Sequence, residues 1–559
     1  MEVVYIICVG FVFLVVKMIY DSKNNKEKLK YKLMNQFGKV PTWEYTAEKF
    51  ESIKKYYDSK RDDKVDVDDI TWNDIDMDDI YMLMNNTCTS MGEEYLYAML
   101  RKLQYNDEQL KTVDQLADYF STHKEERLKL QIKLSNIGRT NIISVYEYIN
   151  VLDRIKDESV MKHALQAVGV IAALCLVPVS PAIGLFGTIG MLAFNMITYF
   201  KSKMKIEAYL NIVSYISHML TSIDDIHKDC CEIIKPMMDE VYEAAKKFKE
   251  FKRGAVIVGG GVSGGNIADI IMDYWRMLFH IDIIQFYRII KIFRKHRDEL
   301  NLMYEKLGLI DACIAVASFR KMLPYYVKPV LFSNNKPSIE VDEVYHVMIE
   351  NPVVNSLHEK RSVLITGSNA SGKSTFIKTL AINAILSQTI YTSLSKNYTA
   401  SYFNVASSMA LRDNIFSQES YYIVEIKSLK RIMDRLNSKY PLLCFVDEVL
   451  RGTNTLERIA ASSEILCGLS KANALCFAAT HDIELTHILE DYYSNYHFQE
   501  QIVDNNILFD YKLYEGRAVS KNAIKLLSMI GYSKDIIQKA TNAANHFLTT
   551  GEWEKIGRR

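Results

Sequence analysis

Glycine, lysine and hydroxyl side chains occur at a fixed spacing in residues 367–375, which read Gly-Ser-Asn-Ala-Ser-Gly-Lys-Ser-Thr. The pattern G-x-x-x-x-G-K-[ST] is met by Gly367, Gly372, Lys373 and Ser374. Glycines allow a backbone turn tight enough to point N–H groups at phosphate oxygens. We expect Lys373 to reach the β- and γ-phosphates and the Ser374 hydroxyl to ligate Mg²⁺. The spacing therefore predicts a loop that binds the phosphates of a nucleotide.

Two carboxylates, Asp447 and Glu448, follow the apolar run of residues 441–446. Such a run is typical of a buried parallel strand, whose C-terminal end faces the nucleotide in sheets of this class. We expect Asp447 to hold Mg²⁺ through water and Glu448 to polarise the attacking water. Taken alone, an apolar run with this ending is more often an ordinary strand end. Its position downstream of the phosphate loop favours the catalytic interpretation.

The predicted strands and helix starts place the phosphate loop and the other candidate side chains of the site. The apolar run 363–366 predicts a strand before the phosphate loop, and a helical pattern follows from Lys373. A helix in that place directs its positive N-terminal end at the phosphates. His481 follows another apolar run, 474–479, and Ser420 precedes a helical stretch. Taken alone, His481 would be a structural hydrogen-bonding group and Ser420 a simple N-cap.

Four segments together resemble the MutS-type ATPases of DNA mismatch repair, within the wider ABC-like P-loop class. They are residues 367–375, 420–426, 447–455 and 479–482, in the order and spacing of that family. The resemblance implies that ATP is the nucleotide and that Mg²⁺ accompanies it. The implied ATP-binding residues are Gly367, Ser368, Asn369, Ala370, Ser371, Gly372, Lys373, Ser374, Thr375 and Ser420. The implied metal ligands are Ser374 and Asp447, and the implied catalytic residues are Glu448 and His481, which senses the γ-phosphate.

The same resemblance implies a homodimer. Asn369 is implied to contact the γ-phosphate region, Ser420 to reach the nucleotide of a partner subunit, and the loop 451–455 to line the interface. Sites of this family are completed only when two ATPase domains meet. The chain departs from the family at residues 370–371, Ala-Ser in place of Met-Gly, and at 420–422, Ser-Tyr-Tyr in place of Ser-Thr-Phe. These departures are expected to affect rates rather than ATP binding.

The N-terminal residues 3–16 are apolar and carry no charge. A helix over residues 3–20 would rise about 27 Å, close to the thickness of a bilayer core. A cleaved signal peptide is disfavoured, because a basic start and an A-x-A-like cleavage site are missing. Lysines follow at positions 23, 26, 28, 30 and 32, so the positive-inside rule places the chain beyond residue 20 in the cytoplasm. The sequence thus predicts a membrane protein with a cytoplasmic ATPase domain.

A second apolar segment, from Ala164 to Phe200, contains no charged residue. Pro178 and Pro181 near its middle would end one helix and begin another. Lysines flank both ends, so a transmembrane or re-entrant hairpin with both ends in the cytoplasm is expected. The alternative is a buried hairpin in a soluble core. In the resembled family, a clamp that closes around DNA interrupts the lever helices at this position.

The expected fold is multidomain, with an α-helical lever/core domain, transmembrane helices and an α/β P-loop ATPase domain of the MutS type. Residues 79–101 and 309–320 resemble the opening and the return of the family's lever. The acidic run 62–79 is expected to be a solvated helix start. The expected domains are a transmembrane helix at 1–20, a helical linker and first lever part at 21–160, the hairpin at 161–204, return lever helices at 205–330 and the ATPase domain at 331–559.

Charge and cysteine usage narrow the possible functions. The 68 basic and 68 acidic residues balance, so the chain lacks the overall positive charge typical of nucleic-acid binders. Nine cysteines without a C-x-x-C pair indicate neither a zinc site nor a disulfide framework.

Two functions remain open. In the favoured one, a membrane-anchored dimer hydrolyses Mg-ATP and couples ATP binding to lever movement on the bilayer or on a membrane partner. In the other, the chain is a DNA-binding ATPase that acts on mismatched duplex DNA in mismatch repair. The balanced charge, the replaced clamp and the lack of room for a mismatch-reading domain before residue 41 weigh against the second.

Overall fold

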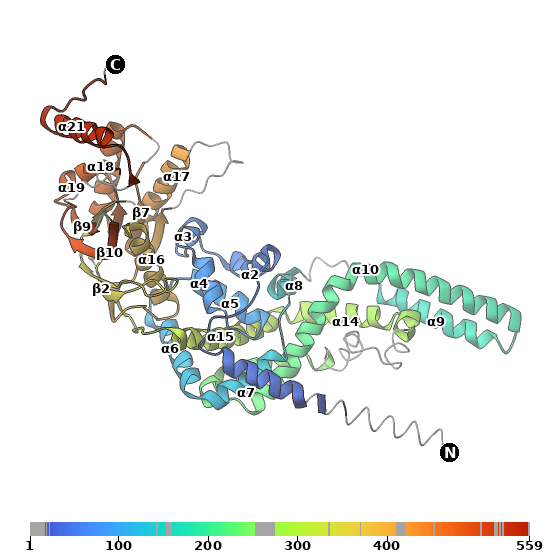
Figure 1. The fold of residues 1–559 in the computed structure, drawn as a ribbon. Coiled ribbons are helices and arrows are strands. Elements are labelled where there is room, and N and C mark those ends of the chain that lie inside the picture. Colours follow the sequence, from blue (N-terminus) through green and yellow to red (C-terminus); the bar gives the residue numbers. More distant parts are fainter. Residues whose placement is uncertain are drawn as a thin grey trace. The chain divides into compact units, whose positions relative to one another are not determined.

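The computed structural model contains two compact units (Figure 1). It describes residues 17–556 except 18–19, 22, 141–142, 152–158, 252–273, 334–335, 369–370, 410–420, 451–452, 504–505, 519–523, 525–526 and 528–529. A helical unit comprises residues up to 62, 79–102 and 106–323, and an α/β unit comprises 63–78, 103–105 and 324–559. Most of the N-terminal segment predicted to span a membrane lies outside the described residues.

A closely packed helix pair forms the centre of the helical unit. The pair is α5 (Ser90–Arg101) and α15 (Arg297–Met322), and Gly92 and Gly308 allow its close approach. A Cβ on Gly92 would lie 2.2 Å from Oδ2 of Asp311. The buried Asp311 carboxylate accepts hydrogen bonds from backbone N–H groups just before α5. Burial outweighs these bonds and raises the pKa of Asp311 to about 6.

Two further helices of this unit pack against that pair. α2 (Ala47–Lys60) contacts α5, and α6 (Asp107–Thr122) contacts α15. A helical stretch over residues 23–36 precedes them. Further helices are α4 (Met77–Met84), which starts in the α/β unit, α7 (Lys124–Ser135), α8 (Val145–Val151), α11 (Lys235–Lys246) and α14 (Ile281–Lys295).

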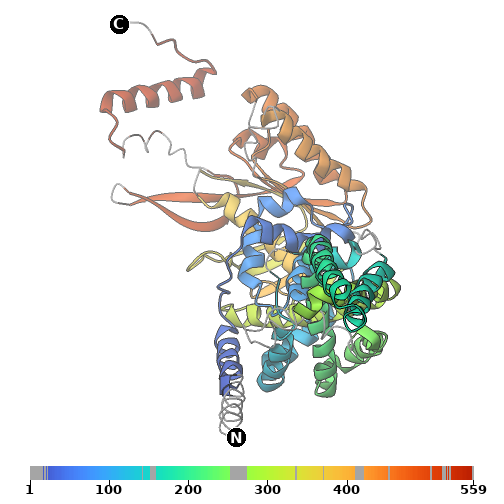
Figure 2. The same cartoon turned by 90° about the vertical axis from the view of Figure 1, so that its right-hand side faces the viewer.

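Two apolar helices of the helical unit form a hairpin. α9 (Val160–Leu176) and α10 (Pro181–Lys228) lie side by side and are joined by a turn at residues 177–180 (Figures 1 and 2). α10 continues well past residue 204, the expected end of the hairpin, because the lysine-rich stretch after the apolar part contains no glycine or proline. Within the described residues, one helix, over Pro181–Glu207, is long and apolar enough to be a candidate span, with a mean hydropathy of 1.5.

A six-stranded sheet in the order β10-β9-β4-β8-β7-β6 forms the core of the α/β unit. All neighbouring strands pair in parallel except β10, which is antiparallel to β9. The three central strands β4, β8 and β7 are almost fully buried, as their apolar sequences predict. Their C-terminal ends therefore meet at one edge. The strands are β4 (Ser362–Thr366), β6 (Asn404–Ser408), β7 (Leu442–Asp447), β8 (Ala474–Ala479), β9 (Tyr493–Val503) and β10 (Asn506–Glu515).

A smaller sheet and five α-helices complete the part of this unit that the structure describes after residue 324. The smaller sheet has the order β1-β5-β2-β3. Its strands are β1 (Val330–Phe332), β2 (Ile339–Val344), β3 (Asn355–Glu359) and β5 (Asn397–Ser401). The helices are α16 (Lys373–Thr389), α17 (Tyr421–Asp434), α18 (Thr455–Lys471), α19 (Ile483–Ile488) and α21 (Lys534–Thr550).

The acidic run is only in part the solvated helix start that its charge predicted, because Asp69 is exposed in the first turn of a helix whereas other carboxylates of the run are buried. Residues 63–78, which include helix α3 (Asp69–Asp74), belong to the α/β unit. Asp68 and Asp74 are only 8 % and 3 % exposed. The prediction fails at these two residues because Asp68 pairs with Arg431 of α17 and with Arg435 directly after that helix, whereas Asp74 accepts a hydrogen bond from Ser407, 333 residues away in the chain.

Candidate nucleotide-binding site

The phosphate loop joins β4 to α16 and depends on its glycines. The backbone angle φ is +143° at Gly367 and +105° at Gly372, a region that favours glycine. A Cβ on Gly367 would lie 2.6 Å from the carbonyl oxygen of Phe498. α16 begins at Lys373, so the unpaired N–H groups of its first turn point toward the loop. The local backbone therefore has the features of an anion-binding turn.

Lys373 folds back over this loop. Its Nζ donates hydrogen bonds of 2.8 Å to the carbonyl oxygens of Gly367 and Ser368. In the same loop, the Ser371 hydroxyl is buried and has no hydrogen-bond partner among the described residues. Charged phosphate oxygens are stronger acceptors for an ammonium than peptide carbonyls are. Both side chains therefore suit a phosphate group as ligand.

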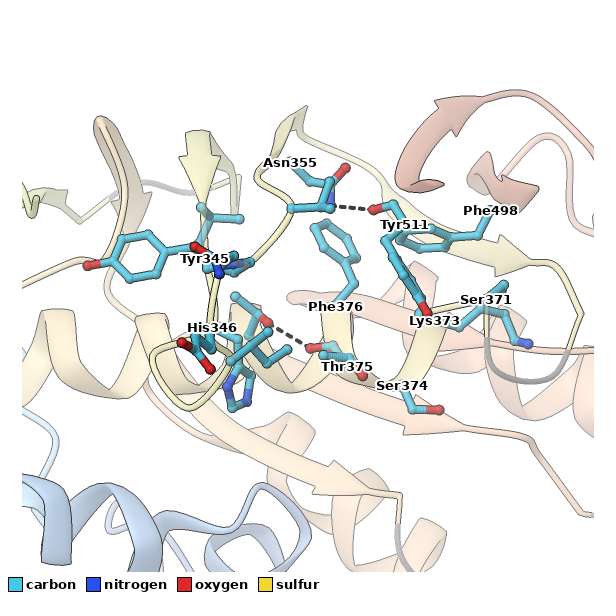
Figure 3. A pocket seen from close by; sticks show the side chains of 18 of the residues that line it. Tyr345, His346, Asn355, Ser371, Lys373, Ser374, Thr375, Phe376, Phe498 and Tyr511 are labelled. Atoms are coloured by element: carbon cyan, nitrogen blue, oxygen red, sulfur yellow. Dashed lines mark hydrogen bonds between the residues drawn. The ribbon is translucent and has the colours of Figure 1, made fainter. Parts of the chain in front are cut away.

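A cavity of about 560 Å³ opens beside the phosphate loop (Figure 3). It is within the range of volumes that hold small molecules and cofactors in proteins. The predicted site residues that line it are Ser371, Gly372, Lys373, Ser374, Thr375 and Glu448. The structure thus brings the phosphate loop and one of the two predicted carboxylates to a single cavity.

Further residues line this cavity that the sequence did not single out. Figure 3 shows Tyr345 and His346 on one side and Tyr511 on the other. Asn355 holds Tyr511 in place, because its Nδ2 donates a hydrogen bond of 3.0 Å to the Tyr511 carbonyl oxygen. Burial, aided by the Lys378 ammonium, lowers the pKa of His346 and so favours its neutral ring. These rings suit a flat heterocyclic base.

The Tyr511→Ala variant is expected to bind ATP about 2- to 12-fold more weakly, because stacking on an aromatic ring contributes roughly 0.5–1.5 kcal/mol. Tyr511→Phe keeps the ring and is the matched control, with an affinity close to that of the wild type. Titration with a fluorescent ATP analogue measures both variants. Equal affinities of Tyr511→Ala and the wild type would remove Tyr511 from the binding site.

The other end of the site holds a carboxylate suited to a cation. β7 brings Asp447 to the carboxyl edge of the sheet, opposite Ala479 of β8. Oδ1 of Asp447 is buried and has no hydrogen-bond partner among the described residues, which is costly for an anionic oxygen unless a cation binds it. Ser374 is exposed in the first turn of α16. Because Mg²⁺ is commonly held by one or two carboxylates together with phosphates, these groups fit the predicted ion.

The two predicted catalytic side chains contact each other. Oε1 of Glu448 lies 3.0 Å from Nε2 of His481. Glu448 has a left-handed backbone, with φ of +56°, and its N–H donates a hydrogen bond of 3.0 Å to the carbonyl oxygen of Ala479. Strained backbone of this kind clusters at functional sites. With His481 and Arg458, Glu448 also lines a second cavity of about 250 Å³.

Other predicted site residues are placed elsewhere or are not described. Ser368 donates a hydrogen bond to Glu500 of β9. Asn369, Ala370 and Ser420 lie outside the described residues, as do residues 451–452 of the loop predicted to line a dimer interface. Their roles, like the roles of the other site residues in ATP binding, stay predictions.

The fold and the site define a class of protein. A phosphate loop between a buried parallel strand and a helix, with carboxylates at the end of a neighbouring strand, is the arrangement of P-loop nucleotide hydrolases. Residues 363–548 match the family model described as MutS domain V. The chain therefore carries an ATPase domain of the MutS type over these residues, and it is similar to known MutS proteins.

Three relatives illustrate the similarity. DNA mismatch repair protein MutS of Thermotoga maritima is 29% identical over 258 residues, which cover 44% of this chain and 32% of the relative. DNA mismatch repair protein MSH3 of Candida albicans is 29% identical over 261 residues, or 42% of this chain and 25% of the relative. MutS protein homolog 4 of Homo sapiens is 28% identical over 267 residues, which cover 44% of this chain and 28% of the relative. The matched segment thus spans about a third or less of each relative.

Proposed function

We propose that this protein hydrolyses Mg-ATP in a dimer of MutS-type ATPase domains and acts at a membrane. One observation carries the ATPase proposal. Lys373, Ser374 and Glu448 line a single cavity, and Asp447, whose buried oxygen lacks a partner among the described residues, directly precedes Glu448. Each of these groups has a task in phosphoryl transfer.

The proposed reaction uses these side chains in turn. Lys373 exchanges its carbonyl partners for β- and γ-phosphate oxygens, and Ser374 and Asp447 hold Mg²⁺. When bound, the ion offsets the charge that develops on the phosphates. Glu448 orients a water molecule and takes up its proton while the water oxygen bonds to the γ-phosphorus. The bond from that phosphorus to the bridging oxygen breaks, and ADP leaves with the oxygen. His481 keeps the Glu448 carboxylate in position.

A second copy of the chain is proposed to complete the site. The family resemblance implies that Ser420 and the loop 451–455 act across such an interface. α21 supports association, because its apolar residues Ile536 and Phe547 are 48% and 37% exposed. An apolar stripe on an exposed helix favours packing against a partner.

The α9–α10 hairpin is proposed to enter a lipid bilayer. Its side chains Leu165, Ile183, Phe186 and Ile197 are 63–75% exposed. A contiguous apolar surface of this kind marks an interaction site or a membrane contact. Lysines at positions 201, 203 and 205 follow the apolar part, where phospholipid headgroups favour positive charge.

A tryptophan placed on the hairpin tests the bilayer contact. In Phe186→Trp, lipids brominated in their acyl chains should quench the added indole several-fold more than in the control Tyr492→Trp, whose site lies on the α/β unit and is 39% exposed. The measurement uses the full chain reconstituted into vesicles. Subtracting the fluorescence of the wild type, which has four tryptophans of its own, leaves the fluorescence of the added indole. Equal quenching in the two variants would contradict insertion of the hairpin.

Action on mismatched DNA is the second candidate, because two of the similar proteins are DNA mismatch repair proteins by name. The balanced charge of this chain weighs against it. ATP turnover measured with vesicles, matched duplex or mismatched duplex at low salt separates the candidates, since phosphate contacts weaken as salt rises. Stimulation by vesicles alone supports the membrane function. Stimulation by mismatched DNA without an effect of vesicles would favour repair.

A further inference from the structure

A short acidic segment of the N-terminal half is built into the α/β unit. Residues 63–78, here named the acidic strap, belong to that unit, whereas the chain on either side, up to residue 62 and from residue 79, belongs to the helical unit. Both ends of the strap are therefore covalently joined to the helical unit. Any force that the helical unit exerts along the chain acts on the contacts of the strap.

The strap holds the free edge of the six-stranded sheet. Among the strands that the structure describes, β6 is the edge strand, with β7 as its one neighbour. The Ser407 N–H donates a hydrogen bond of 3.0 Å to Oγ1 of Thr71. Oδ2 of Asp74 accepts two more, from the Ser407 hydroxyl at 2.7 Å and from the Met409 N–H at 2.9 Å. Asp74 is thus fixed at the point where the chain leaves β6.

A second carboxylate of the strap holds the helix that follows. Asp68 pairs with Arg431 of α17, and its Oδ2 lies 3.0 Å from Nη2 of Arg435. Arg431 also donates a hydrogen bond to the carbonyl oxygen of Ser407. The strap therefore fixes both neighbours of residues 410–420, the end of β6 before them and α17 after them.

These contacts lead directly to the catalytic carboxylates. β6 pairs with β7 in parallel as far as Ser408 and Val446, and Val446 immediately precedes Asp447. From α17, the buried Glu425 carboxylate accepts a hydrogen bond from the N–H of Leu450, two residues after Glu448. The contacts of the strap thus connect to the segment that carries the carboxylates along two routes, one through a strand and one through a helix.

We propose that Asp74 and Asp68 are positioning residues for ATP hydrolysis, through which the helical unit sets the placement of Asp447 and Glu448. This inference rests on the proposed ATPase function. It concerns turnover more than nucleotide binding, because Asp74 and Asp68 contact β6 and residues 431–435, whereas the phosphate loop lies between β4 and α16. Loss of the Asp74 contacts frees the end of β6 and misplaces the carboxylates.

The kinetic test compares three variants of the full chain. Asp74→Ala should lower kcat by about tenfold or more while the Kd for ATP stays within about threefold of the wild type. Asp74→Asn keeps an oxygen that can accept both hydrogen bonds, so it should restore most of the rate. Asp76→Asn is the matched control, since Asp76 lies in the same strap but pairs with Lys378 at 2.6 Å instead of β6. It should keep wild-type turnover.

Other kinetic outcomes would overturn the proposal. Wild-type kcat in Asp74→Ala would do so. If Asp74→Ala lost ATP affinity and turnover together and had a lower Tm, the proposal would also fail, because Asp74 would then stabilise the fold as a whole. Equal losses in Asp74→Asn and Asp74→Ala would show that the two hydrogen bonds do not set the rate.

Hydrogen exchange tests the positioning step without turnover. In Asp74→Ala, amides of residues 404–409 and 442–450 should exchange faster than in the wild type, whereas those of residues 373–389 should be unchanged. Faster exchange in 404–409 alone would contradict transmission to the carboxylates. If the wild type hydrolysed no ATP, the proposed function would fail, and this exchange pattern would still decide whether the strap positions the end of β7.

Discussion

Replacing Lys373 by alanine is expected to lower ATP affinity by about 100-fold or more. The ammonium lies in the phosphate loop, where it donates hydrogen bonds to the carbonyl oxygens of Gly367 and Ser368. Phosphates entering the cavity would take these bonds over. Charge-assisted hydrogen bonds contribute roughly 1.5–3 kcal/mol each, so losing two of them predicts a decrease of about this size. Equilibrium dialysis with radiolabelled ATP measures the affinity.

A second lysine of the same helix provides the control. Lys378→Ala removes the same charge from α16, but Lys378 pairs with Asp76 on the protein surface. Surface ion pairs contribute little to stability, so this variant should bind ATP like the wild type. If Lys373→Ala kept wild-type affinity, the nucleotide would have to bind outside the phosphate loop.

Replacing Glu448 by glutamine is expected to leave ATP binding nearly unchanged and to slow hydrolysis by about 10²–10⁴-fold, the usual contribution of a general base. Glutamine has the same size and keeps an oxygen for His481, but it cannot take up the proton of the attacking water. ATP should therefore persist in the site and a closed dimer should accumulate. Single-turnover assays measure the rate, and sedimentation measures the dimer.

The control for this change is Glu464→Gln, which neutralises an exposed carboxylate on α18. It should hydrolyse ATP at the wild-type rate. Wild-type turnover in Glu448→Gln would instead mean that a different group activates the water, and the contact between Glu448 and His481 would then be structural.

The phosphate loop and the carboxylate strand could be predicted from the sequence because their determinants are local. Glycines that require positive φ, an apolar run and a helix start lie within a few residues of Lys373. The same holds for the buried strand that ends at Asp447. Their meeting at one cavity follows from the parallel order of the sheet, since carboxyl ends of parallel strands share an edge.

The remaining features depend on contacts distant in the chain. Tyr345, Asn355 and Tyr511 meet from three separate segments, so no spacing indicates a wall of the cavity. Asp74 belongs to a charged run, and from the sequence alone such a run predicts solvent-exposed side chains. Its hydrogen-bond partner Ser407 on β6 is distant in the chain, so the sequence does not indicate that Asp74 is buried. The change from apolar to lysine-rich sequence after Phe200 does not mark a helix end, because lysine favours helix as strongly as most apolar residues do.

Mg²⁺-dependent ATP turnover by the purified full chain, measured over a range of protein concentrations, tests the central proposal most directly. We predict that turnover per chain rises with protein concentration to a plateau, because two ATPase domains must meet, and that removal of Mg²⁺ with EDTA abolishes it. Turnover per chain that does not depend on protein concentration, or no turnover at any concentration, would contradict ATP hydrolysis in a dimer.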